Sequence, residues 1–381
     1  MTTKNPLPLQ DGLDGIVAAE TRLSEVDGEA GRLVIAGFPV EVLAPTAGFE
    51  ETVHLLWHLA LPNAEDADRL RQALVARRGL PAATLDLIRA AAATDAEPMD
   101  VLRMAAATLS LLPGAGEPRE DALRLVAAFP TIVATWSRLA ARLEPIDPDP
   151  DLGHAENFLY MLEGARPTVD RSRALETYLN TVVDHGMNAS TFTARVIAST
   201  RSDVVSAVTG AVGALKGPLH GGAPGPALDM VYEIGEPSRA EEVVRAHLAR
   251  GERLMGFGHR VYKVRDPRAD VLSDAADRLA GAGTHAELHA LARAVEKTVL
   301  EVLAEVKPGR RLDTNVEYYT ALLLHSLDLP KELFTPTFAV ARVAGWTAHC
   351  FEQLAGGRLI RPASRYVGTT CERWPALAER S

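Results

Sequence analysis

The chain of 381 residues contains few cysteines and few aromatic residues, and it has no long apolar run. Its two cysteines, Cys350 and Cys371, show no spacing typical of a metal or redox site, and so low a number indicates free thiols in a reducing compartment. No segment approaches the roughly 20 apolar residues that a membrane-spanning helix needs, and the first ten residues lack the apolar core of a signal peptide. We therefore expect a cytoplasmic protein that contacts no membrane.

An excess of positive charge is also missing. The 40 Lys and Arg residues are outnumbered by 50 Asp and Glu residues, which gives a formal net charge of −10. An acidic chain repels the nucleic-acid backbone, so the composition argues against nucleic acid as a partner. One segment departs from this balance, since residues 256–268 read GFGHRVYKVRDPR. The sequence therefore indicates a site for a small anion in an acidic protein.

Most of the chain shows the spacing of amphipathic helices. Apolar residues recur three and four positions apart, most clearly over residues 122–143, 172–184 and 284–306, which predicts an all-α fold. The exception is a predicted β-hairpin around residues 27–31, where apolar and polar residues alternate. Loops are expected at residues 145–153 and 221–226. No flexible linker is present, so a second domain must form where the chain leaves the first domain and returns to it.

The glycine-rich segment combines groups that suit an anion whose carbonyl must be polarised. Gly256 and Gly258 allow a close approach of the backbone to a ligand, His259 can give a proton to a carbonyl oxygen, and Arg268 matches a carboxylate. The alternative is an exposed loop with solvated basic side chains. The segment lacks the third glycine and the preceding strand of a dinucleotide-binding motif, so we exclude a Rossmann fold.

Two further histidines stand next to predicted helices. His185 precedes Gly186, which can end one helix, and Asn188 or Ser190, which can cap the next. His220 lies in a turn before a helix that begins with prolines, and the helix N-terminus would lower its pKa and keep the imidazole neutral. A neutral imidazole can donate a hydrogen bond to an enolate oxygen. The alternative for both histidines is an ordinary hydrogen bond with nearby backbone.

Three charged residues occupy apolar or proline-containing segments. Glu317 lies at the head of an apolar helix, where it can act as a base or simply interact with the helix dipole. Arg342 has apolar neighbours and Arg361 precedes Pro362, and an arginine among apolar neighbours needs an anionic partner. That partner can be a substrate or a structural carboxylate.

Two histidine pairs have the spacing of metal ligands on a helix. His54 and His58 form one pair, and His285 and His289 form the other. Neither pair has an evident third ligand nearby, so we expect surface or interface positions and no metal site.

The order of motifs along the chain resembles the citrate synthase family almost from end to end. The segments that carry this resemblance are GLDGIVAAETRLSEVDGEAGRLVIAGFPVEVLA, AENFLYMLEGARP, DHGMNASTF, GPLHGGA, GFGHRVYKVRDPR, NVEYY, FAVARVAGW and RLIRPASRYVG. The resemblance implies a helical homodimer that condenses acetyl-CoA with oxaloacetate to give citrate and free CoA. It also implies a large domain of residues 1–221 and 329–381, and a small domain of residues 222–328 that closes over the active site.

The resemblance also implies catalytic roles. His220 resembles the histidine that stabilises the enol of acetyl-CoA, His259 the histidine that polarises the oxaloacetate ketone, and Glu317 occupies the place of the base. That base is normally Asp, so the longer Glu317 side chain must retract by one methylene, which affects the rate and the preferred acyl-CoA. Two further departures are Gly186, where many members carry Glu, and GGAPGP, where many have GGANE.

Substrate-binding residues follow in the same way. For oxaloacetate the resemblance points to His185, Asn188, Arg268, Arg342 and Arg361, the last of them contributed by the other subunit. For CoA it points to Leu254, Gly256, Phe257, Gly258, Lys263, Arg311 and Asn315. We expect no metal and no cofactor, because preorganised donors in a closed site can stabilise the developing charges and acetyl-CoA is itself a substrate.

Two alternatives to citrate synthase activity stay open. One is a 2-methylcitrate synthase that uses propionyl-CoA, since one added methylene in an apolar pocket changes the free energy by only about 1–3 kcal/mol. The other is a ligand-binding regulator that has kept the fold without turnover.

Overall fold

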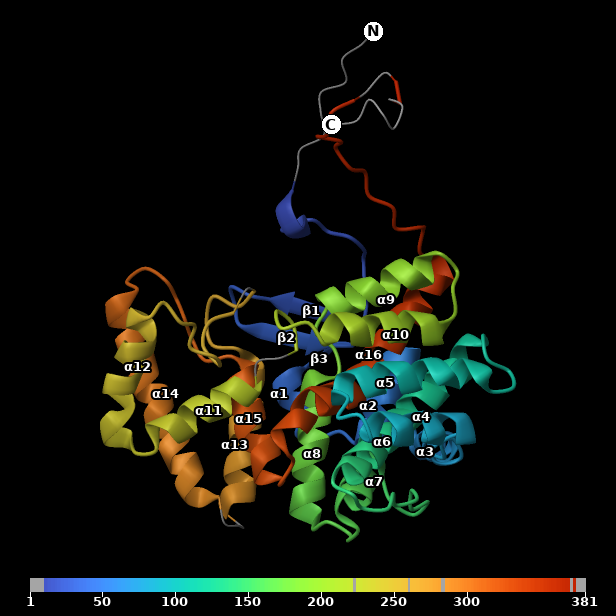
Figure 1. Cartoon of the computed structure of the whole chain (residues 1–381), viewed down its shortest axis with the longest axis horizontal. Helices are drawn as coiled ribbons and strands as arrows, with labels where there is room; N and C mark the ends of the chain where they lie inside the picture. The colour runs from blue at the N-terminus through green and yellow to red at the C-terminus, as the bar shows by residue number, and fades with distance from the viewer. Residues whose placement is uncertain (1–9, 222–223, 260, 282–284, 371–372, 375–381) are drawn as a thin grey trace.

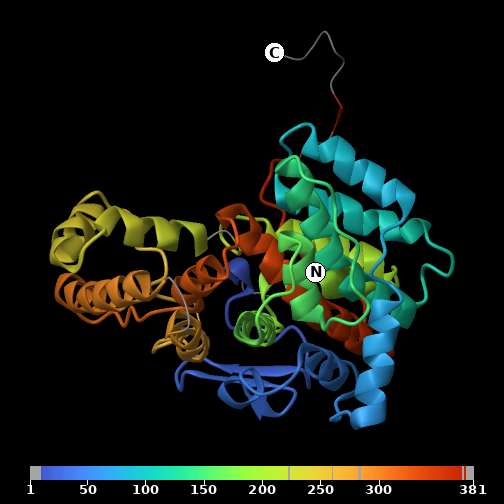
Figure 2. The ribbon, with the colours of Figure 1, turned by 90° about the horizontal axis from the view of Figure 1, so that it is seen from below.

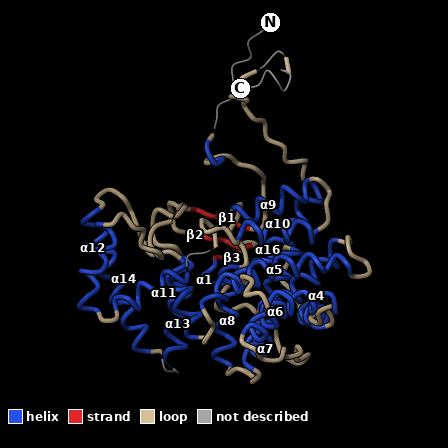
Figure 3. Tube along the Cα trace, in the orientation of Figure 1, coloured by secondary structure: helices blue, strands red, loops and turns tan. Residues whose placement is uncertain are grey.

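The computed structural model describes residues 10–221, 224–259, 261–281, 285–370 and 373–374. Within these residues the chain forms sixteen α-helices and one small antiparallel sheet, as Figure 3 shows. The prediction of an all-α fold with one hairpin is therefore confirmed. No described helix is both long and apolar enough to cross a membrane.

The helices fall into two groups. The helices that precede residue 216 are α1 (Val40–Leu43), α2 (Phe49–His58), α3 (Ala64–Val75), α4 (Ala82–Ala92), α5 (Pro98–Thr108), α6 (Pro118–Ala140), α7 (His154–Glu163), α8 (Val169–Val182), α9 (Ala189–Ser199) and α10 (Val204–Leu215). The later helices are α11 (Pro224–Ile234), α12 (Ala240–Ala249), α13 (Pro267–Gly281), α14 (Ala286–Val306), α15 (Val316–Ser326) and α16 (Phe334–Gly356). Figures 1 and 2 show α11 to α15 on one side of the molecule and α2 to α10 with α16 on the other.

The apolar spacing located each predicted helix to within a few residues, and it placed the end of α14 correctly at Val306. The helix predicted over residues 122–143 is α6, which begins four residues earlier, at Pro118. There the Glu117 carboxylate accepts a hydrogen bond from the Glu120 N–H and caps the helix. Because the first turn of α6 is polar, it carries no apolar periodicity, and the sequence pattern missed it.

Helix α16 forms the centre of the larger group of helices. It contacts α2, α5, α6, α8, α9 and α10, and most of its residues are buried. Its mean composition is apolar, but it also carries Arg342, His349 and Gln353, all of which are buried. A buried polar side chain needs hydrogen-bond partners, so at these three residues α16 makes polar contacts rather than apolar core packing.

The predicted hairpin consists of β1 (Ser24–Asp27) and β2 (Arg32–Ile35), followed by a short third strand, β3 (Phe38–Pro39), that the sequence did not predict. In the β1–β2 pair, Ser24 lies opposite Ile35. Leu33 and Ile35 are fully buried, which is the alternation that a sheet with one covered face requires. At its tip, the Asp27 carboxylate accepts hydrogen bonds from two backbone N–H groups of the turn.

The two ends of the described chain leave the helical body on the same side. Figure 1 shows the segment before β1 and the segment after α16 extending away from the helices. Both segments expose apolar side chains, among them Ile16, Val17, Tyr366 and Val367.

Candidate active site

The glycine-rich loop is fixed against the segment that leads into α15. The Gly258 N–H donates to the Asp313 carbonyl at 2.7 Å, and the Asn315 N–H donates to the Gly256 carbonyl at 2.9 Å. Gly256 and Gly258 have φ values of +90° and +82°, and a Cβ on Gly256 would lie 2.9 Å from the Tyr318 side chain. The glycines are thus required for the turn and for this close packing.

The tip of the β-hairpin covers the other side of the same loop. The Lys263 N–H donates to the Gly28 carbonyl at 2.8 Å, and a Cβ on Gly28 would lie only 2.2 Å from the Val261 carbonyl oxygen. A Cβ on Gly31 would similarly lie 2.6 Å from the Val264 side chain. The interpretation of residues 256–268 as an exposed, solvated loop is therefore wrong.

Asp266 holds the arginine at the end of this loop. Its carboxylate accepts from Arg268 Nε at 3.0 Å and Nη2 at 2.7 Å, and both side chains are buried. Burial lowers the pKa of Arg268, but the adjacent Asp266 outweighs it and the net direction is upward. The same carboxylate accepts from the Val316 N–H at 3.3 Å, which ties Arg268 to the first turn of α15. The sequence analysis did not single out Asp266, although it lies inside the motif.

His259 is a neutral donor whose tautomer is set by the backbone. Its Nδ1 accepts hydrogen bonds from the Val261 N–H at 3.0 Å and the Tyr262 N–H at 3.1 Å. This pattern assigns the ring proton to Nε2. Burial, and then the charge of Arg268, lower the pKa of His259 to about 4. Near pH 7 the imidazole can therefore donate a hydrogen bond through Nε2.

His185 lies beside this ring. The ring centroids of His185 and His259 are 5.8 Å apart, and His185 Nε2 is 3.1 Å from the Tyr262 hydroxyl. Burial, followed by Arg268 and Arg342, lowers the pKa of His185 well below its ordinary value. Tyr262 is buried between the two histidines, and the sequence analysis missed it because an aromatic residue within a motif also suits core packing.

A buried polar network fixes the backbone before His185. The Asp184 carboxylate accepts from Ser24 Oγ at 2.5 Å and from His349 Nε2 at 3.1 Å. His349 Nδ1 in turn lies 3.1 Å from Arg195 Nη1, and Arg195 also binds Glu352 and Gln353. Asp184 and His349 are completely buried.

Gly186 belongs to the same junction. Its φ is +58°, and a Cβ would lie 3.3 Å from the Val26 side chain of the hairpin. Its N–H donates to Ser24 Oγ at 2.8 Å. Helix α8 ends before this point, at Val182, so Gly186 shapes the turn toward α9 rather than ending the helix directly.

Asn188 caps α9, as predicted. Its Oδ1 accepts from the Thr191 N–H at 3.1 Å, and its amide donates to Thr191 Oγ1 at 2.9 Å. The side chain is thus engaged within its own turn.

His220 is a second neutral histidine, with the opposite tautomer. Its Nε2 lies 3.3 Å from the Ser190 N–H and 2.8 Å from Ser190 Oγ, so Nε2 accepts and the ring proton belongs on Nδ1. The pKa of His220 is lowered to about 4. We predicted this direction from the nearby helix N-terminus, but the causes are burial and then the charge of Arg342.

Glu317 is the second residue of α15. Its N–H donates to the Asn315 side chain at 3.0 Å, while no hydrogen bond from the described residues reaches its carboxylate. Burial raises the pKa of Glu317 to about 7, although Arg268 acts in the opposite direction. A carboxylate that only stabilised the helix dipole would have a lowered pKa, so burial is the dominant effect at this position.

Arg342 lacks a carboxylate partner in the part of the chain that the structure describes. Its Nε donates to the Val182 carbonyl at 2.7 Å, and its guanidinium carbon lies 4.5 Å from the centre of the Phe338 ring. Burial lowers the pKa of Arg342 to about 10. A buried arginine without a counter-charge favours an anionic ligand.

The residues predicted to bind CoA, and Arg361, do not all form one cluster with the histidines and Glu317. Leu254 is buried and Phe257 packs on Tyr318, while the Asn315 amide donates to the Gly258 carbonyl at 2.8 Å and so holds the loop itself. Arg311 is exposed. Arg361 is also exposed, in the extended segment after α16, and the structure does not bring it to the other site residues.

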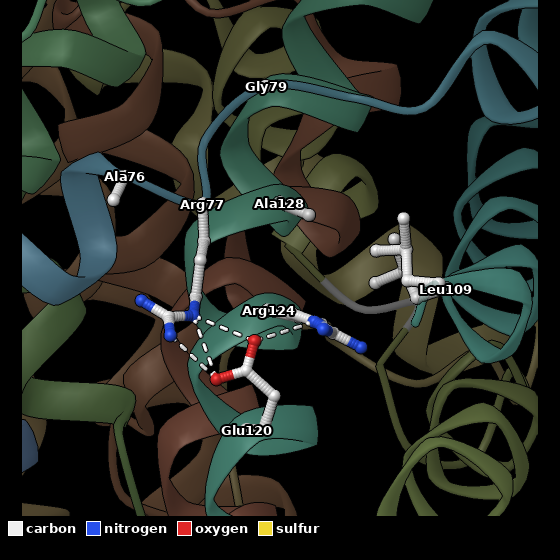
Figure 4. Close-up of a pocket in the computed structure, with 8 residues that line it drawn as sticks. Ala76, Arg77, Gly79, Leu109, Glu120, Arg124 and Ala128 are labelled. Carbon is white, nitrogen blue, oxygen red and sulfur yellow. Dashed lines mark hydrogen bonds and ion pairs between the residues drawn. The ribbon is translucent and has the colours of Figure 1, made fainter. Parts of the chain in front are cut away.

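Polar clusters also occur away from the glycine-rich loop. One cavity of about 400 Å³ lies between α6 and the ends of α3 and α5, and Figure 4 shows Glu120 inside it, bound to both Arg77 and Arg124. These charges already neutralise one another in large part. His285 is the N-cap of α14 rather than a residue within the helix, and the His289 N–H donates to its carbonyl at 3.1 Å. No cluster of three metal-ligating side chains occurs among the described residues.

Known proteins resemble this chain over nearly its whole length. Residues 12–363 match the family model described as "Citrate synthase, C-terminal domain". The chain belongs to the citrate synthase family.

Relatives within the family have two activities in their names. Citrate synthase 2 of Bacillus subtilis is 39% identical over 97% of this chain and 99% of its own length. The 2-methylcitrate synthase of Mycobacterium tuberculosis H37Rv is also 39% identical, over 94% of this chain and 91% of its own. Among solved structures, the ternary complex of carboxymethyl coenzyme A and oxaloacetate with citrate synthase from Thermoplasma acidophilum superimposes with a TM-score of 0.89, at 29% identity, covering 98% of this chain and all of the other.

Proposed function

We propose that this chain condenses acetyl-CoA with oxaloacetate and hydrolyses the citryl thioester to citrate and CoA, as a transferase of the citrate synthase family. The observation that carries the proposal is the set of three groups with complementary proton states. His220 and His259 are neutral donors with opposite tautomers, and Glu317 has a pKa of about 7. A base and two neutral donors are what enolisation and addition to a ketone require.

The first step is removal of a proton from the acetyl methyl group. Ionised Glu317 takes this proton while His220 donates a hydrogen bond from Nδ1 to the thioester oxygen, on which the enolate charge develops. Because His220 is neutral and only partly exposed, it keeps its Nδ1 proton and has it available for this hydrogen bond.

The second step forms the carbon–carbon bond. The enolate carbon attacks the ketone of oxaloacetate, and His259 gives its Nε2 proton to the ketone oxygen as negative charge develops there. Water then attacks the citryl thioester, the carbon–sulfur bond breaks, one water proton leaves on the thiol of CoA, and the new carboxylic acid loses its proton to solvent. The proton that Glu317 took from the methyl group returns to His259 through solvent, which restores both groups for the next turnover. Arg268, Arg342, His185 and Asn188 supply the polar surroundings of the dicarboxylate in this proposal.

We assign domain closure to residues 222–328, which move over the remainder of the chain when oxaloacetate binds. Closure would bring the loop at residues 254–258, together with Lys263, Arg311 and Asn315, against CoA and exclude water from the thioester. In a homodimer, the segment after α16 would carry Arg361 into the site of the partner subunit. The exposure of Arg361 in the segment after α16 supports this arrangement. No metal or cofactor takes part in the proposed steps.

A 2-methylcitrate synthase activity is the second candidate. It is supported by the equal identity to relatives of both names and by the replacement of Asp with Glu317, which changes the room available for the acyl group. The same chemistry then uses propionyl-CoA, and the proton leaves a methylene instead of a methyl group.

The test is release of free thiol from acetyl-CoA or propionyl-CoA in the presence of oxaloacetate. We expect activity with at least one acyl-CoA, and the ratio of the two kcat/KM values decides between the candidates. Glu317→Gln should reduce kcat by at least about a hundredfold, as expected for loss of a general base. If the wild-type chain binds oxaloacetate but releases no thiol with either substrate, it is a ligand-binding regulator and the proposal is wrong.

A further inference from the structure

Tyr178 places a hydroxyl group without a partner deep inside the molecule. The side chain lies in α8 and is completely buried, and no residue that the structure describes forms a hydrogen bond with its oxygen. Burial of an unpaired hydroxyl is unfavourable, whereas a phenylalanine at this position would avoid the cost. A polar group retained under these conditions points to a role that the unliganded chain does not display.

The charged groups around this hydroxyl are those of the proposed active site. Glu317 acts on it most strongly, followed by Arg342 and Arg268. Tyr178 also lies one helical turn before Val182, whose carbonyl accepts the hydrogen bond from Arg342. Burial is the main reason that the pKa of Tyr178 is raised, so the phenol keeps its proton and has it available for donation.

Among the described residues, the Glu317 carboxylate lacks a hydrogen-bond donor, just as the Tyr178 hydroxyl lacks an acceptor. Its carboxylate receives no hydrogen bond from the part of the chain that the structure describes. A carboxylate base needs one oxygen for the substrate proton, which leaves the other oxygen available to accept a hydrogen bond. The Tyr178 oxygen is shielded from solvent, so a substrate in the cleft does not reach it in this conformation, whereas a side chain as flexible as Glu can turn toward it.

We propose that Tyr178 is a positioning residue for Glu317. When the enzyme closes over both substrates, its O–H donates to the Glu317 oxygen that does not take the substrate proton. This inference rests on the proposed function, because it assumes that Glu317 is the base. A donor to the ionised form favours that form, so the bond lowers the pKa of Glu317 in the closed complex and orients the carboxylate.

The test is the pH profile of kcat, with both substrates saturating, for wild type and Tyr178→Phe. We expect the apparent pKa of the acid limb to be about one unit higher in the variant than in the wild type. At pH values below this pKa the kcat of the variant should then be about tenfold lower than that of the wild type, and at higher pH the two values should be equal. The thermal midpoint should stay the same or rise, because the variant removes an unpaired buried hydroxyl and keeps the ring. Tyr160→Phe is the matched control, since Tyr160 is a partly buried tyrosine of α7 outside the site, and its limb should not move.

A second background tests the contact itself. In Glu317→Asp the shorter carboxylate cannot reach the same donor, so adding Tyr178→Phe should produce little further shift of the limb. The inference is wrong if the acid limb of Tyr178→Phe has the same apparent pKa as that of the wild type. If, in addition, the KM for oxaloacetate rises, the hydroxyl binds the substrate instead of Glu317. A lower thermal midpoint with a uniform loss of kcat at every pH would assign it a structural role. An inactive wild-type chain would overturn the proposed function as well, whereas an active wild type with an unmoved limb in the variant overturns this inference alone.

Discussion

Asp266 and Arg268 form a buried ion pair between residues only two positions apart, with both nitrogens of the Arg268 fork, Nε and Nη2, bound to the carboxylate. Arg342, the other buried arginine of the site, has no carboxylate partner among the described residues. The two arginines are therefore not equivalent. Arg268 is fixed and largely neutralised before any ligand arrives, while the charge of Arg342 remains for the substrate.

Removing the carboxylate of this pair should be costly for stability. Asp266→Asn leaves Arg268 as an uncompensated buried charge and weakens the contact with the first turn of α15, so we expect the free energy of unfolding to fall by about 3–5 kcal/mol. Denaturant unfolding measures this change. The matched control is Glu65→Gln, which removes the exposed partner of Arg69 and should change stability by less than about 0.5 kcal/mol. Equal effects of the two variants would contradict the importance of burial.

The activity of the wild-type chain should rise with pH through about 7. Burial raises the pKa of Glu317 to about 7, and only its ionised form can act as base. His220 and His259 have pKa values of about 4, so they stay neutral across this range and do not shape the limb. A profile of kcat/KM for the acyl-CoA between pH 5.5 and 8.5, flat below 7, would contradict the assignment of Glu317.

The raised pKa of Glu317 should also make the stability of the fold depend on pH. Between its ordinary pKa of 4.5 and its raised value of about 7, Glu317 binds more protons in the folded chain than in the unfolded chain. Its contribution to stability is therefore present at low pH and is lost as the pH rises through 7. Glu317→Gln should flatten this part of the stability profile, measured by denaturant unfolding at several pH values.

Contribution of Arg361 to the partner subunit can be tested by complementation. Arg361→Ala and Arg342→Ala should each weaken oxaloacetate binding severely, because each removes a charged hydrogen bond. A heterodimer of the two variants contains one intact site if Arg361 acts in the other subunit, so random mixing should restore about a quarter of the wild-type activity. No recovery after mixing would show that Arg361 serves its own subunit.

The sequence singled out the proposed catalytic residues but not the residues that hold them in place. His220, His259 and Glu317 were identifiable because their residue types occur in motifs, and the helical periodicity located the elements that carry them. Asp266 and Asp184 were not singled out, and Ser190 was considered only as a helix cap, although Asp266 binds Arg268 and Ser190 binds His220 directly. Asp266 lies only two positions from Arg268 and was overlooked within the motif. The contacts of Ser190 with His220 and of Asp184 with His349 join segments distant in sequence, and a single sequence does not specify such contacts.

The sequence predicted the hairpin but not its contact with the glycine-rich loop. Its contact with residues 261–264 depends on the absence of a side chain at Gly28 and Gly31, and a glycine in a turn has too many ordinary explanations to reveal a distant contact. The cause of the lowered His220 pKa was mistaken for a similar reason, since burial and Arg342 belong to the tertiary structure.

The polar network behind His185 continues beyond the site. Gln353, which binds Arg195, also donates to the Arg358 carbonyl at 3.0 Å, and Ser199 accepts from the Ile360 N–H at 3.0 Å. The last two contacts tie the start of the segment after α16 to α16 and to α9. If that segment reaches a neighbouring subunit, a disturbance of the backbone near His185 in one subunit would also displace the Arg361 that this subunit contributes to its partner. Both active sites of a dimer would then lose activity together.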